Sequence, residues 1–174
     1  MTEQTQTYLT YLWVALAIIL LAGLLLWWGW RGRRRRQSAI PAPQEIPAPL
    51  LDQEPLVGAE GMVVGTVHAG DHLDRVAVHG LGLRSHGRLE VHTQGVAVLR
   101  AGAENYLIPV QSLTHVRTDR GVVGKFVESD GVVIIGWRLG QTEVETAFRP
   151  RYARSHQPLL EQLETLIDQE ASTP

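Results

Sequence analysis

The sequence has no cysteine among its 174 residues. Without thiols the chain forms no disulfide bond, no zinc site built on thiolates and no cysteine nucleophile. A lack of cysteine also fits a reducing cytosol. Composition therefore removes three classes of site before any motif is considered.

Charge is absent from the apolar run between Leu9 and Trp30. At about 1.5 Å per residue, a helix over this run is about 33 Å long, enough to cross a hydrocarbon core of about 30 Å. No Lys or Arg precedes the run, and Glu3 is the only charged side chain there. The sequence predicts one transmembrane helix over residues 8–30.

Arginines follow the run at once and set the predicted orientation. Because positively charged flanks stay on the cytoplasmic side, we expect a plasma-membrane protein with its N-terminus outside and everything after Arg36 in the cytoplasm. Aromatic residues at both ends are typical of membrane interfaces. The predicted membrane-interface residues are Tyr8, Tyr11, Trp13, Trp27, Trp28, Trp30, Arg31, Arg33, Arg34, Arg35 and Arg36. A cleaved secretory signal is the alternative, but it needs a positive n-region and a shorter apolar core.

The rest of the chain divides by composition. Residues 37–58 hold five prolines among Ala, Gln and Glu, which is typical of a semi-rigid spacer. Beyond Gly58 there is room for one domain of roughly 100 to 115 residues, near the common domain size. We expect a short extracytoplasmic N-terminus (1–7), a transmembrane helix (8–30), an arginine cluster with a proline-rich linker (31–58), a cytosolic domain (59–170) and a disordered tail (171–174).

From Gly61 onward, short β-branched segments are separated by Gly, Asp and Asn, the pattern of an all-β domain. Gly95, Gly131 and Gly140 stand where hairpin turns need a positive φ. In the last segment Glu143 and Glu145 alternate with apolar residues, which predicts one face exposed to water. The expected strands are Met62–His68, Arg75–Val78, Arg88–Val91, Val96–Arg100, Asn105–Val110, Val122–Val127, Val132–Leu139 and Thr142–Phe148.

The chain ends on a different pattern, the apolar stripe of an amphipathic helix with Ser155 as its expected N-cap. The stripe consists of Leu159, Leu160, Leu163, Leu166 and Ile167. Such a helix must cover an apolar surface. We therefore expect a mainly β fold, in which a bent antiparallel sheet or partly open barrel is capped by this helix and preceded by one transmembrane helix. This is the pleckstrin-homology (PH) architecture.

Several segments, together with the anchor, the arginine run and the proline linker, resemble the membrane-anchored PH-like proteins of actinobacteria. These segments are Gly70–Val76, Ala103–Pro109, Gly136–Gly140 and Thr146–Arg149. The resemblance covers nearly the whole chain. Proteins of this kind are often labelled transporters or exported membrane proteins, but a single helix cannot form a transport pathway alone. The resemblance therefore implies at most an accessory role in transport.

Two motifs suggest chemistry but lack residues that the chemistry needs. Gly121–Lys125 resembles a phosphate-binding loop, but it has two residues between its glycines instead of four, and Phe126 replaces the required Ser or Thr. His68 and His72 resemble part of a zinc-hydrolase motif whose first two histidines are missing here, whereas catalytic zinc needs three ligands. We expect no catalytic residue, no metal site and no cofactor.

Charge disfavours two kinds of ligand. After Gly58 the chain has eleven basic and fourteen acidic residues, a net charge of −3, whereas nucleic-acid binding needs a basic face. The loop after the first expected strand holds Asp71 and Asp74 before Arg75, so it lacks the Lys and Arg cluster of PH domains that bind phosphoinositides. Further cations that could gather elsewhere are Arg117, Arg120, Lys125 and Arg138. Recognition of lipid head groups is therefore disfavoured.

Together these features predict a single-pass membrane protein with a non-catalytic PH-like domain. Its expected role is to tether or scaffold a protein partner at the cytoplasmic membrane surface. Two alternatives stay open, an accessory subunit of a membrane transport or export complex and a sensor of anionic lipids. A hydrolase would need a convergent polar pocket, which no motif predicts.

Overall fold

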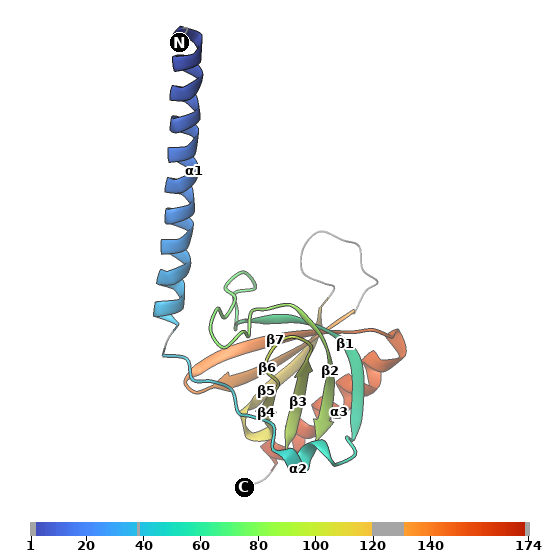
Figure 1. Cartoon of the computed structure of the whole chain (residues 1–174). Coiled ribbons are helices and arrows are strands. Elements are labelled where there is room, and N and C mark those ends of the chain that lie inside the picture. The colour runs from blue at the N-terminus through green and yellow to red at the C-terminus, as the bar shows by residue number, and fades with distance from the viewer. Residues whose placement is uncertain (1–2, 38, 120–130, 173–174) are drawn as a thin grey trace. The chain divides into compact units, whose positions relative to one another are not determined.

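The structure is a computed structural model that describes residues 3–37, 39–119 and 131–172. The chain divides into two compact units, Met1–Ser38 and Ala39–Pro174. The first unit is the helix α1 (Glu3–Arg36; Figure 1). Within α1, Tyr11–Gly29 has a mean hydropathy of 2.3 and no buried residue. This helix is therefore long and apolar enough to cross a membrane.

The second unit is built on one seven-stranded antiparallel sheet in the order β4-β3-β2-β1-β7-β6-β5 (Figure 1). β1 is twelve residues long and pairs with both β2 and β7, which are far apart in the sequence. The strands are β1 (Val57–His68), β2 (Ser85–His92), β3 (Gly95–Arg100), β4 (Tyr106–Pro109), β5 (Leu113–Asp119), β6 (Val132–Leu139) and β7 (Thr142–Pro150).

The hydrophobic core lies on the inner face of the bent sheet. Alternate strand residues point to this face, so Val63 of β1, Leu89 of β2, Ile135 of β6 and Phe148 of β7 are all fully buried. Their burial removes the apolar side of each strand from water, which is the main stabilising term in folding. The expected mainly β fold is confirmed.

The predicted C-terminal amphipathic helix is also confirmed and forms α3 (His156–Ala171). Leu159, Leu163 and Leu166 are buried in the core, and α3 packs against β5, β1 and β2. Ser155 occupies the N-cap position as expected, but its side chain makes no capping hydrogen bond. The helix is therefore held by its apolar face and not by its cap.

Residues 40–56, which we call the N-terminal strap, lie against the domain, although we expected a semi-rigid spacer that packs no core. The N–H of Leu107 in edge strand β4 donates to the Gln44 carbonyl at 2.8 Å. The short helix α2 (Ala48–Leu51) then buries Leu50 against Ala97 and Leu107. The prolines do not prevent this docking, because the strap needs only an extended backbone and a few apolar side chains.

The strap begins at Ile40, which is part of the hydrophobic core. Its carbonyl oxygen accepts a hydrogen bond from His79 Nε2 at 2.9 Å. His79 has a φ of 54°, a left-handed backbone conformation that is uncommon for residues other than glycine. The first residues of the second unit are thus tied to the domain by both packing and hydrogen bonding.

Six of the eight expected strands are confirmed, β6 with the expected bounds and the other five with bounds that differ by a few residues. The expected strand Arg75–Val78 is wrong, because this segment is a loop with a single bridge between Val67 and Arg75. β5 was not expected, and the expected strand Val122–Val127 lies outside the described residues. The turn glycines Gly95 and Gly140 have φ values of 143° and 63°, as the hairpin pattern predicts.

Candidate functional site

The predicted membrane-interface residues lie along α1. The Arg31 guanidinium stacks over the Trp27 ring, 5.6 Å from its centre. The helix continues through Trp30, Arg33, Arg34, Arg35 and Arg36. The aromatic side chains with large exposed fractions are Tyr8, Tyr11, Trp13, Trp27 and Trp28. Their contact with a bilayer interface stays a prediction.

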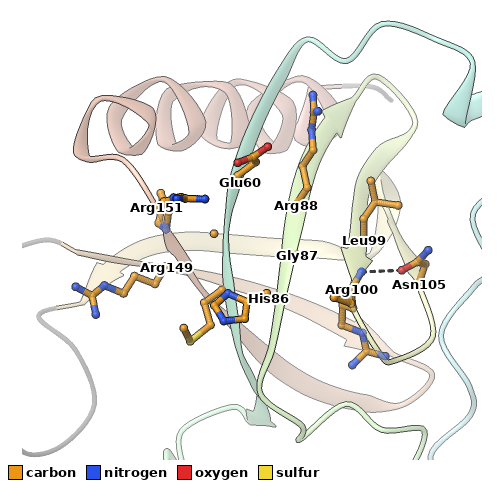
Figure 2. Close-up of a pocket in the computed structure, with 13 residues that line it drawn as sticks. Glu60, His86, Gly87, Arg88, Leu99, Arg100, Asn105, Arg149 and Arg151 are labelled. Atoms are coloured by element: carbon orange, nitrogen blue, oxygen red, sulfur yellow. Dashed lines mark hydrogen bonds between the residues drawn. The ribbon is translucent and has the colours of Figure 1, made fainter.

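A groove with a volume of about 840 Å³ opens on the outer face of the sheet, across β7, β1, β2 and β3 (Figure 2). Among the residues that the structure describes, its lining contains four arginines and a single acidic residue. We call it the basic groove. It is lined by residues 60–62, 86–88, 99–101 and 149–151 and by Asn105.

Strand register explains how the groove brings these residues together. Glu60 of β1 pairs with Arg88 of β2, and Arg88 pairs with Leu99 of β3. On the other side of β1, the N–H of Arg151 donates to the Glu60 carbonyl at 2.8 Å. Residues about 90 positions apart in the sequence therefore form one row over β1, β2 and β3 that starts just beyond the end of β7, with Arg151 and Arg88 on either side of Glu60.

A second row runs beside the first. Met62 pairs with Arg149 on β7 and with His86 on β2. Figure 2 shows the Arg149 side chain extending away from the groove, whereas the Arg151 side chain lies toward β1. His86 lies near the centre of the view, and Met62 is its cross-strand partner. The groove thus combines separated cations with the apolar side chain of Met62 next to His86.

Two glycines allow the strands to approach each other beneath the groove. Gly61 and Gly87 are cross-strand partners on β1 and β2. A Cβ on Gly61 would meet the carbonyl oxygen of Arg149, and a Cβ on Gly87 would meet that of Leu99. Any larger residue would push β7 or β3 away, so glycine is needed at both positions for close strand pairing.

Two arginines of the groove differ in how they are held. Arg100 is buried, and its guanidinium donates to the carbonyls of Glu104 and Gly80 and lies 4.9 Å from the Tyr106 ring centre. Its role is to hold backbone carbonyls in place. Arg88 is about half exposed, and its Nε lies 2.8 Å from Glu90 Oε1. The Glu90 side chain is only 12% exposed, whereas the exposed half of Arg88 remains accessible to a ligand.

A separate charged cluster lies on the outer face of β5 and β7. Glu145 accepts hydrogen bonds from Arg117 Nη2 at 2.8 Å and from His115 Nε2 at 3.2 Å. Its side chain is only 9% exposed, so the expectation that Glu145 faces water is wrong. Glu143 on the same strand is exposed as expected. Burial raises the pKa of Glu145, but the hydrogen bonds and charges of Arg117 and His115 outweigh it and lower that pKa overall.

Of the other cations that the sequence left open, Arg117 and Arg138 lie in the described residues. Arg117 is held by Glu145 and Asp119, and Arg138 is exposed on β6. Arg120 and Lys125 lie outside the described residues.

Two histidine environments bear on the expectation of no metal site. His68 lies 2.9 Å from the Asp74 carboxylate, and His72 lines a small neighbouring pocket. Within residues 3–37, 39–119 and 131–172, no group of three or more His, Asp or Glu side chains is arranged to hold a metal ion. We interpret the pair of His68 and Asp74 as a local contact that orders the loop.

The sequence did not reveal the basic groove. Its arginines lie on outward positions of separate strands, and dispersed strand cations are usually a solvated face. The signal that could have found it is the register between β7, β1 and β2, which depends on knowing that the last strand pairs with the first. No motif within a single segment carries that information.

The comparisons with known proteins concern the second unit. A family model described as "Bacterial PH domain-like" matches residues 40–164, beginning at the first buried residue of the strap. A solved structure of Vav1 bound by an allosteric inhibitor is 14% identical with a TM-score of 0.42. The alignment covers 73% of this chain, and the chain spans only 30% of that Vav1 chain. No curated protein shows significant similarity to the sequence.

Proposed function

Because the chain belongs to the bacterial PH domain-like family, we propose that it is a single-pass protein that tethers or scaffolds a protein partner at the cytoplasmic face of the plasma membrane. PH-like domains are generally non-catalytic, and the proposed role is likewise non-catalytic. The observation that carries the proposal is the short connection between an apolar helix and a folded domain. That connection would keep the domain at the membrane surface.

The anchor in this proposal is α1. A helix over Tyr11–Gly29 is about 29 Å long at about 1.5 Å per residue, close to the thickness of a hydrocarbon core. The arginines that end α1 favour a cytoplasmic location for its C-terminal end. A cleavable signal sequence would be shorter and would carry its basic residues before the apolar run.

The connection between anchor and domain is shorter than the sequence suggested. α1 ends at Arg36, and Ile40 already packs in the domain core. At about 3.5 Å per residue, the chain between these residues spans at most about 14 Å, instead of the roughly 25 Å of a flexible spacer over residues 37–58. A domain held this closely meets other membrane-surface proteins at an effective concentration of order mM, so modest affinity suffices.

Crosslinking in intact cells tests the proposal with three forms of the chain. These are the full chain, residues 39–174 without α1, and residues 1–38 fused to an unrelated soluble domain. We expect the full chain to capture a protein that residues 39–174 capture at lower yield, as quantified by mass spectrometry. The fusion should not capture it, because the contact belongs to the PH-like domain.

Two outcomes would contradict the proposal. Capture of the same protein by the fusion would place the contact in the membrane and favour an accessory subunit of a transport or export complex. Equal capture with and without α1 would show that membrane tethering has no part in binding.

A further inference from the structure

Resting on the proposed function, we propose that the basic groove binds an extended acidic peptide segment of the partner. In this mode Arg88 and Arg151 bind two carboxylates of the segment. Met62 and Leu99 contact the apolar side chains beside them. The class of ligand follows from the charge, the spacing and the lining of the groove.

The charge of the groove favours an acidic ligand. Residues after Gly58 carry a net charge of −3, yet four of their eleven basic residues line this one groove. Glu60 is the only acidic residue in its lining within the described part of the chain. Arg88 and Arg151 are the two of these basic residues whose side chains can serve the groove, and they outnumber Glu60, so the groove is positive although the domain is acidic. A groove of this kind attracts an acidic segment and repels a basic one, which supplies specificity.

The spacing of Arg151 and Arg88 favours an extended peptide. Arg151 and Arg88 lie in one row on either side of β1, and strands in a sheet are about 4.8 Å apart, so their Cα atoms are separated by about 10 Å. An extended polyproline-type segment advances about 9.3 Å in three residues and returns its side chains to the same side. Carboxylates three residues apart therefore match the two arginines.

The arrangement of the arginines disfavours a compact anion such as a phosphate. The Arg100 guanidinium is already bound to the carbonyls of Gly80 and Glu104, and the Arg149 side chain extends away from the groove (Figure 2). Arg88 lies on β2 and Arg151 just beyond the end of β7, and Figure 2 shows their guanidinium groups apart from each other. A volume of about 840 Å³ with apolar lining residues suits a peptide better than a small ion.

The test uses the full chain in nanodiscs of phosphatidylcholine, whose net charge is zero. The probe is a fluorescent eight-residue peptide of Ala, Leu and Pro with two glutamates three residues apart, and its affinity is measured by anisotropy. We expect Arg88→Gln and Arg151→Gln each to weaken binding about five- to tenfold. Arg138→Gln, the matched loss of one exposed arginine on β6, should change affinity by less than about twofold.

Several outcomes would overturn the inference. If Arg138→Gln weakened peptide binding equally, the loss of any positive charge would explain the effect, and the groove would have no special part in binding. Unchanged binding of a probe with glutamine in place of both glutamates would show that the groove does not recognise the carboxylates. Groove-dependent binding to nanodiscs with anionic lipid, without binding of the probe, would assign the groove to head groups.

Different results would contradict peptide binding by the groove and tethering by the whole chain. If Arg88→Gln and Arg151→Gln leave crosslinking to the partner unchanged in cells, the tethering role stands and the groove is not its contact. If the unmodified chain captures no partner, the tethering role fails whatever the probe does. Circular dichroism of each variant separates lost binding from lost folding.

Discussion

Thr146 lies at the centre of a buried polar network within the apolar core. Its Oγ1 accepts a hydrogen bond from Trp137 Nε1 at 2.9 Å and lies 2.9 Å from Thr66 Oγ1. Both threonines are fully buried, and Trp137 is the largest fully buried side chain. Because a buried indole N–H needs a partner, the position of Thr146 fixes how Trp137 packs.

Replacing Thr146 by Val should lower the free energy of unfolding of residues 39–174 by about 1–3 kcal/mol, measured by urea denaturation. The indole N–H and the Thr66 hydroxyl lose their partner, while the volume hardly changes. The control is Thr165→Val, which removes an exposed hydroxyl bound to the Glu161 carbonyl and should cost no more than about 0.5 kcal/mol. Equal losses in the two variants would show that the network contributes nothing.

Glu145 gives the stability of the domain a defined pH dependence. Its pKa is lowered in the folded state by Arg117 and His115, despite the opposing effect of burial. A lowered pKa stabilises the fold above the ordinary Glu pKa of about 4.3, and this contribution is lost as pH falls through the folded pKa. Glu145→Gln should therefore reduce stability at pH 7, and its difference from the unmodified domain should narrow as pH falls below about 4.3.

Glu143→Gln is the matched control for this measurement, because Glu143 lies on the same strand and is exposed. It should leave the pH profile of urea unfolding unchanged. If the stability difference between Glu145→Gln and the unmodified domain stayed constant from pH 7 to pH 3, the ion pairs with Arg117 and His115 would not be its cause.

At the scale of elements, the strap offers a matched pair of neighbouring leucines. Leu50 is 1% exposed and packs against Ala97 and Leu107, whereas Leu51 is 50% exposed. Leu50→Ala should destabilise residues 39–174 by about 2–5 kcal/mol, and Leu51→Ala by about 0.5 kcal/mol or less. Urea denaturation measures both, and limited proteolysis should cleave the strap faster in Leu50→Ala alone. Equal behaviour of the two variants would show that the strap is not held against the domain by Leu50.

The sequence predicted elements whose pattern lies within one segment. The apolar stripe of α3 and the glycine turns at Gly95 and Gly140 carry their own periodicity, so they could be recognised. β5 was not predicted because a register shift between Leu113 and His115 interrupts the alternation of inward and outward side chains. Val76 and Val78 suggested a strand, but they are buried because a loop folds into the core.

Long-range arrangement explains what the sequence could not supply. Docking of the strap depends on the edge strand β4, and the basic groove depends on the pairing of β7 with β1. Both bring together residues that no local pattern connects. Glu145 was assigned to water for the same reason, because its partners Arg117 and His115 lie on a strand that was not expected.

At the scale of the whole molecule, the proposed orientation can be tested by labelling single cysteines, since the chain has none of its own. We expect Thr5→Cys to react with an impermeant maleimide in intact cells, because basic residues at the end of α1 favour the cytoplasmic side. Gln141→Cys, in an exposed hairpin turn, should react only after lysis. The reverse pattern would place the PH-like domain outside the cell and contradict the proposed function.

The last prediction separates attraction by the anchor's flank from binding by the domain. Residues 39–174 carry eleven basic and seventeen acidic residues, a net charge of −6, so the fragment should stay in the supernatant when spun with anionic liposomes. A peptide of residues 31–39 should sediment with them and be released as salt rises, since each arginine contributes about 1 kcal/mol near an anionic surface.

Arg151→Gln supplies the control for the fragment. If residues 39–174 sediment with anionic liposomes at physiological salt and this variant does not, the basic groove binds lipid and the anionic-lipid sensor replaces the protein tether. If fragment and variant both stay in solution, the arginines of α1 supply the electrostatic attraction to the membrane. The groove then remains open to a partner while the domain is held at the surface, as tethering requires.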